Sequence, residues 1–222
     1  MADQGTTGFG GGPRPDTSDM VAVHKALRGA LGSGAQRVRD VDPSDAARRE
    51  LIADYYDNIL WFLDVHHNGE EELVFPRVRE RNPDAAAVVD TMEGQHHEVV
   101  QLLKDAGVSR TAWASGDDSA QATLANQLQA LSDATNAHLD QEEAQLLPLC
   151  ADCLTVEEWA EMPGHALRQY QGDKVWLVLG LIMEQRNAEE QAVMLEGMPP
   201  PVSQMWRDMG SDAFQKLAAT VG

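Results

Sequence analysis

The chain has 222 residues, 43% hydrophobic and 24% charged, which is long enough for one sizeable core with further elements around it. Aspartate and glutamate outnumber lysine and arginine by 36 to 17. The resulting net charge of −19 argues against nucleic acid or an anionic membrane surface as a partner, because both would repel the protein. The longest apolar run, at 175–183, has the length of a core helix and falls short of the ~20 residues of a membrane span.

The first nineteen residues are polar and rich in glycine, without the apolar segment of a secretory signal. Two cysteines are too few for a disulfide-stabilised scaffold. We therefore expect a cytoplasmic protein. Its residues 1–17 have the composition of a disordered tail.

Strand signals are nearly absent, whereas helical periodicity recurs along the chain between Gly and Pro clusters. The first expected helices run from Ser18 to 32–34, from Pro43 past Leu73, from Pro83 to 107, and after a loop at 107–118 to about Cys150. Their connections are short, which favours antiparallel neighbours. The sequence therefore predicts an all-α, up-down-up-down four-helix bundle over residues 18–155.

Additional C-terminal helices are expected after the bundle. A short amphipathic piece at 155–162 precedes one long helical segment at roughly 165–195, and the MPPPV sequence at 198–202 separates it from a last helix. The segment at 175–183 is apolar enough to pack onto another helix. We expect residues 156–222 to form a helical extension that packs on the bundle.

The most informative pattern is a repeat with an offset of 72 residues. The positions that coincide are His24 with His96, His66 with His138, Glu70 with Glu142, and Pro76 with Pro148. In each half, the second histidine lies 42 positions after the first. Only seven residues of the chain are histidine, so chance does not explain this register.

The repeat predicts a buried metal site. Positions i and i+4 of a helix share one face, so each HxxxE pair directs an imidazole and a carboxylate toward the apolar side. Burying four imidazoles and two carboxylates without partners would cost several kcal/mol per charged group. Metal ions in the core of a helix bundle relieve that cost. The predicted ligands are His24, His66, Glu70, His96, His138 and Glu142.

The donor set indicates which metals to expect. Imidazole and carboxylate without thiolate suit iron or manganese better than structural zinc. Six protein ligands are too many for one tetrahedral ion and suit two ions, between which the two glutamates can bridge. Manganese and zinc stay open as alternatives to iron.

The four-part pattern resembles that of the hemerythrin-like family, H…HxxxE…H…HxxxE, over about residues 18–155. The resemblance implies two iron ions joined by an oxo or hydroxo bridge inside a four-helix bundle. Oxygen-carrying members have a second histidine one turn after the third-helix ligand, where this chain has Val100. Two six-coordinate ions offer about twelve positions, of which about two would stay open here. One hypothesis is that Glu93, one turn from His96, fills a gap.

Open coordination favours a protein that binds and reacts with a small oxidant (H2O2, O2 or NO), with a catalase- or peroxidase-like activity, in oxidative or nitrosative stress. One alternative is reversible O2 binding for storage. Another is a sensor of O2, iron or redox state that uses the extension to contact a partner, although the sequence identifies no protein partner.

Several neighbouring residues are expected to lie outside the ligand set. His67 and His97 break the repeat, so we expect them to support the ligands from outside or to lie at the surface. Glu71 and Glu143 lie about 140° around the helix from the preceding histidine, which predicts solvated or supporting acids. For His165, and for Cys150 and Cys153 at a helix end, packing is the favoured interpretation.

Overall fold

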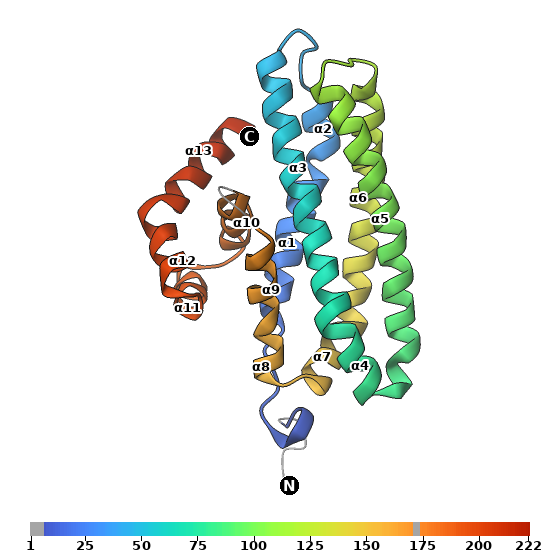
Figure 1. Cartoon of the computed structure of the whole chain (residues 1–222), viewed down its shortest axis with the longest axis vertical. Helices are drawn as coiled ribbons and strands as arrows, with labels where there is room; N and C mark the ends of the chain where they lie inside the picture. The colour runs from blue at the N-terminus through green and yellow to red at the C-terminus, as the bar shows by residue number, and fades with distance from the viewer. Residues whose placement is uncertain (1–6, 171–173) are drawn as a thin grey trace.

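The computed structural model describes residues 7–170 and 174–222. Within these ranges the regular elements are helical, apart from one isolated β-bridge between Thr7 and Pro13. Four long helical rods stand side by side in alternating directions (Figure 1), formed by α1 (Ser18–Gly32) continued by α2 (Gly34–Arg39), α3 (Ala46–Gly69), α5 (Ala86–Ala114) and α6 (Ala120–Gln141). The predicted all-α bundle is confirmed.

The second and fourth rods do not end at α3 and α6. Each passes through one turn of π-helix, η2 (Glu70–Val74) and η4 (Glu142–Leu146), into a short helix, α4 (Phe75–Arg81) and α7 (Leu147–Cys153). In these turns the N–H of Phe75 donates to the carbonyl of Glu70, and that of Leu147 to Glu142, five residues back. The prolines that follow, Pro76 and Pro148, have no N–H, and their rings press on the carbonyl four residues earlier. A wider turn relieves that contact, so the repeated prolines account for the repeated π turns.

The core of the bundle consists of apolar residues that recur at helical spacing. Ile59, Val89 and Leu124, for example, are fully buried. Leu73 is only partly buried, because the π turn shifts the register and directs Val74 inward instead. Asp45 caps the start of α3, where its side chain accepts a 2.9 Å hydrogen bond from the N–H of Arg48.

Two predicted boundaries are wrong. Helix α5 continues to Ala114 through most of the expected loop at 107–118, because Trp113 is buried in the core and holds the last turns in place. The single helix expected at 165–195 is three helices, α9 (Glu161–Gln169), α10 (Lys174–Met183) and α11 (Ala188–Gly197). Asn187 and Glu190 form a capping box that starts α11 anew.

The extension lies along one side of the bundle, against α1 and α3 (Figure 1). It consists of α8 (Val156–Trp159), α9, α10, α11, α12 (Pro200–Met205), the π turn η5 (Trp206–Gly210) and α13 (Ser211–Val221). Helix α10 belongs to the same hydrophobic core as the bundle, and Phe214 of α13 packs on it. A cavity of about 420 Å³ remains between the bundle and α9, α10 and α11. No helix in the described ranges has the length and apolar character needed to cross a bilayer.

Part of the glycine-rich segment contacts the bundle. The Phe9 ring lies under the Arg81 guanidinium at 3.9 Å, and Arg14 pairs with Asp152 at 2.5 Å. Residues 1–6 lie outside the described residues, and the disorder expected for 1–17 stays a prediction, as do the domain boundaries at 18–155 and 156–222.

Glu158 fastens the start of the extension to the bundle. Its carboxylate accepts hydrogen bonds of 2.6 and 2.7 Å from Arg81 and one of 3.0 Å from the backbone N–H of Thr155. The hydrogen bonds from Arg81 lower the pKa of Glu158 to about 2. This carboxylate therefore stabilises the fold above its ordinary pKa of 4.5, and the contribution is lost as the pH falls toward 2.

We predict that Glu158→Gln lowers stability at pH 7 by ~0.5–1 kcal/mol, because the charge-assisted bonds are lost. Thermal unfolding of both proteins measures this difference. It should shrink as the pH falls from 4.5 to 2, because over this range the wild-type carboxyl takes up a proton in the unfolded chain and is still ionised in the folded one. Glu157→Gln is the matched control, since Glu157 is exposed. A difference that persists at pH 2 would contradict this role.

Candidate metal centre

The structure brings together all six side chains predicted as ligands. His24 comes from α1, His66 from α3, His96 from α5 and His138 from α6, and Glu70 and Glu142 are the first residues of the two π turns. None of the six is more than 7% exposed, and both carboxylates are at 1% or less. The repeat thus converges inside the bundle at the level of the π turns.

Each glutamate lies between two imidazoles from different helices. The Oε1 atom of Glu70 is 3.5 Å from Nε2 of His66, and its Oε2 is 3.4 Å from Nε2 of His96. The Oε2 atom of Glu142 is 3.2 Å from Nε2 of His24 and 3.7 Å from Nε2 of His138. Two carboxylates placed in this way suit bridging between two ions.

The outward ring nitrogens of three histidines are held by hydrogen bonds. Nδ1 of His24 pairs with Glu143 Oε1 at 2.9 Å, and Nδ1 of His96 pairs with Glu71 Oε1 at 2.9 Å. Each acid thus pairs with a histidine from the opposite half of the repeat. Both acids therefore support predicted ligands and do not merely face solvent. His138 uses Gln95 in the same way at 3.0 Å. Because a hydrogen bond holds Nδ1 on the outer side of each ring, Nε2 points into the centre, as it does in metal-binding histidines.

Several polar atoms at the centre lack a hydrogen-bond partner among the described residues. They are Nε2 of His24 and His66 and both carboxylate oxygens of Glu70 and Glu142. Leaving a buried polar atom unpaired costs about 1–3 kcal/mol, and more when it is charged. Divalent cations would pair with all of these atoms at once, so the residues present fit a metal centre.

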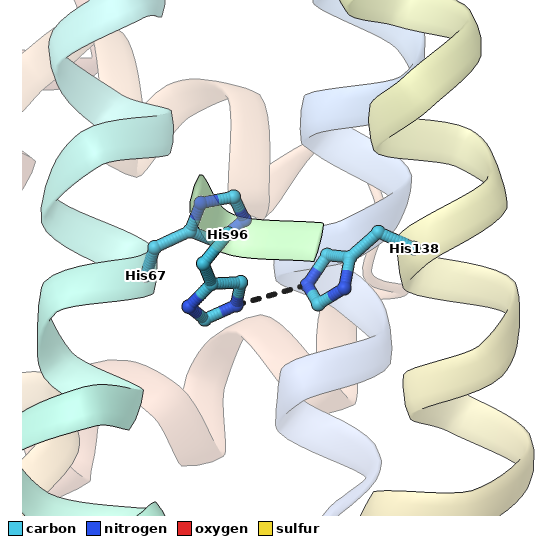
Figure 2. Close-up of side chains that lie close together, drawn as sticks. All are labelled: His67, His96 and His138. Atoms are coloured by element: carbon cyan, nitrogen blue, oxygen red, sulfur yellow. Dashed lines mark hydrogen bonds between the residues drawn. The ribbon is translucent and has the colours of Figure 1, made fainter. Parts of the chain in front are cut away.

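The ligand atoms divide into two groups, within each of which all atoms lie less than 4.8 Å apart. One group consists of His24, His66, Glu70 and Glu142, and the other of His67, His96 and His138. Figure 2 shows the second group, with the ring of His67 above that of His96 and a 3.2 Å hydrogen bond between Nε2 of His96 and Nε2 of His138.

Comparison with models of protein families identifies the family of the bundle. The model of the hemerythrin HHE cation-binding domain matches residues 16–150, more than half of the chain. The chain belongs to the hemerythrin HHE family. Comparisons with curated proteins and with solved structures find no match. Members of this family bind metal ions. In this chain the buried histidines and glutamates described above could hold a metal ion.

Burial and mutual repulsion shape the electrostatics of the hemerythrin-like domain. Burial lowers the pKa of His66 well below its usual value, and a positive charge on His24 lowers it further. Burial, together with the negative charge of Glu142, raises the pKa of Glu70 well above its usual value. For His24, burial opposes protonation, but Glu142 and Glu143 outweigh it and raise the pKa. Without cations, the centre cannot carry both carboxylates in ionised form at low cost.

Two expectations about neighbouring residues need correction. His67 is 2% exposed and lies within the second group, so the surface alternative for it is wrong. The repeat did not indicate this residue because Leu139 occupies the equivalent position. Glu93 does not reach the centre and pairs with Arg79 at 3.1 Å instead, so the hypothesis that it fills a coordination gap is wrong. His97 is exposed, as expected.

The remaining candidates lie outside both groups. Cys150 and Cys153 are buried and, in the described part of the chain, form no disulfide. Burial raises the pKa of the Cys150 thiol, the opposite of what a reactive thiolate requires, so packing stays the better interpretation. His165 is buried beside Gly69, and its Nδ1 lies 3.5 Å from Glu72.

Proposed function

We propose that this hemerythrin-like domain holds two iron ions joined by an oxo or hydroxo bridge. The proposed ligands are the four histidines and two glutamates described above, with Glu70 and Glu142 bridging. The supporting observation is the position of each carboxylate between imidazoles of two helices, with its oxygens unpaired among the described residues. Imidazole and carboxylate donors also suit manganese or zinc, so metal analysis decides between them.

The proposed activity is to bind and react with a small oxidant, namely H2O2, O2 or NO, in a cytoplasmic response to oxidative or nitrosative stress. A bound iron pair supplies electron transfer and a coordination position open to such a molecule. The protein supplies a dry surrounding, since Met92, Val99 and Leu63 are at most 1% exposed. Glu71 and Glu143 hold the imidazoles in the orientation that directs Nε2 inward.

The cavity beside α9 and α10 provides the proposed route for the ligand. It opens toward solvent and reaches His66, the one proposed ligand among the residues that line it. The neighbouring lining residues Val23, Phe62 and Val65 are apolar. This apolar part of the lining, next to His66, suits small uncharged molecules such as O2, H2O2 and NO, whereas Asp16, Asp19 and Arg186 line other parts of the cavity.

Metal analysis and absorption spectroscopy of the purified protein test the proposal. We expect about two iron ions per chain and a change in the absorption spectrum when air is admitted to the reduced protein. Steady O2 release from H2O2, or continuing use of a reductant, would support turnover. H2O2 decay that stops after one equivalent would contradict it. A spectral change that air produces and argon reverses would instead support O2 storage. A protein that binds no metal would contradict the whole proposal.

A further inference from the structure

His67 is a buried imidazole for which the fold provides no hydrogen bond. Its side chain is 2% exposed, and neither Nδ1 nor Nε2 has a partner among the described residues. By contrast, His24, His96 and His138 each bind an oxygen through Nδ1. Burying an unpaired polar group costs about 1–3 kcal/mol. Apolar packing alone would be served better by a leucine, so the imidazole at this position requires a different reason.

The surroundings of His67 are two further imidazoles. Its ring stacks on that of His96, with centroids 4.0 Å apart and planes at 14°, and meets the ring of His138 edge-on at 5.0 Å. The three rings come from α3, α5 and α6, and Figure 2 shows them gathered in the space between α3 and α6. Three neutral imidazoles do not attract one another strongly, and protonation of one would disfavour protonation of the others. A cation among the three rings would give His67 a partner and would replace the 3.2 Å hydrogen bond between Nε2 of His96 and Nε2 of His138.

The helix itself assigns the two adjacent histidines to different groups. Consecutive residues of an α-helix point about 100° apart. His66 therefore points toward α1, where its ring lies 5.2 Å from that of His24, while His67 points toward α5 and α6. The HH pair at 66–67 thus contributes one donor to each of the two groups.

We propose that His67 is a metal ligand that, with His96 and His138, holds the second ion. This inference rests on the proposed two-ion function. Helix α5 has Val100 where oxygen-carrying members of the family have a second histidine. His67 would supply the missing imidazole from α3 instead. The centre then becomes asymmetric, with three histidines at the second ion and two, His24 and His66, at the first. The ion with fewer histidines is the one beside the cavity.

The test replaces His67 by leucine, the residue that the second half of the repeat has at the equivalent position 139. Anaerobic titration with Fe²⁺ or Co²⁺, followed by metal analysis after gel filtration, should show the first ion retained. The second ion should bind at least ~100-fold more weakly, since even partners that only support a ligand are worth 10–100-fold. His97→Leu is the matched control, because His97 is exposed and adjacent to His96, and it should bind two ions as the wild type does.

Thermal unfolding gives a second readout. Metal-free His67→Leu should unfold at the same or a higher temperature than the metal-free wild type, because an unpaired imidazole is removed. Saturating metal should stabilise the variant less than the wild type. The inference is overturned if His67→Leu binds two ions with wild-type affinity, or if it is equally destabilised with and without metal. A wild type that binds no metal would overturn the proposed function itself, which distinguishes the two failures.

Discussion

Replacing Glu70 and Glu142 together by glutamine is expected to abolish tight binding of both metal ions while the bundle stays folded. The two carboxylates are the buried acids among the histidines of the centre, at 1% and 0% exposure. Glutamine has nearly the same size and no charge. Removing one partner of a buried charged pair costs about 3–5 kcal/mol, so each substitution should weaken binding more than ~100-fold. Metal analysis after dialysis measures the loss, and far-UV circular dichroism reports the fold.

A comparison with the supporting acids makes this prediction specific. The double variant Glu71→Gln and Glu143→Gln also removes two negative charges, but from residues that contact Nδ1 of His96 and His24. These acids only orient the ligands, so the expected loss is ~10–100-fold. Retention of two ions by the Glu70/Glu142 double variant, or an equal loss in both double variants, would contradict the bridging role.

Replacing Gly180 by alanine is expected to separate α13 from α10. A Cβ atom at this position would lie 2.1 Å from the ring of Phe214, which is 3% exposed and therefore has little room to move. Overpacking of this kind costs about 1–3 kcal/mol. The contacts that α13 makes with the bundle should be lost as well. Among them are the hydrogen bonds from Arg48 to the carbonyls of Thr220 and Val221. Thermal unfolding and limited proteolysis of the C-terminal segment measure both effects.

Gly107→Ala is the matched control for this experiment. Gly107 lies inside α5. Apart from its chain neighbours and the adjacent backbone of its own helix, no described atom lies within 4 Å of the position of its added Cβ. The control should therefore stabilise the protein by ~0.5–1 kcal/mol through the helix propensity of alanine. We expect Gly180→Ala to keep two ions, because the proposed ligands belong to the bundle. An unchanged unfolding temperature and protease resistance would contradict the tight packing of α13 on α10.

The HxxxE repeat could be interpreted from the sequence because it is a local property of helices. Residues i and i+4 share a face in any α-helix, so the pairs His66/Glu70 and His138/Glu142 had to point the same way. The offset of 72 residues then indicated that both pairs belong to one centre. Apolar periodicity predicted most of the core in the same way, and it failed at Leu73, where the π turn changes the period.

Other features were present in the sequence but depended on packing for their meaning. The box of Asn187 and Glu190 that starts α11 is recognisable as a capping pattern, yet the apolar run before it favoured one long helix. Helix α5 passes through the expected loop because Trp113 finds a place in the core. A local sequence pattern does not predict that a particular side chain will be buried, since its burial depends on segments that are distant in the sequence.

By itself, the sequence determined the helical class, the repeat and the six side chains that meet at the centre, because helix geometry relates spacing to direction. The tertiary structure decided what surrounds them. It paired Glu71 and Glu143 with the histidines of the opposite halves, excluded Glu93, and placed His67 beside His96 and His138. These relations depend on how each helix is rotated against its neighbours, and that rotation is set by the interlocking of side chains from four helices at once.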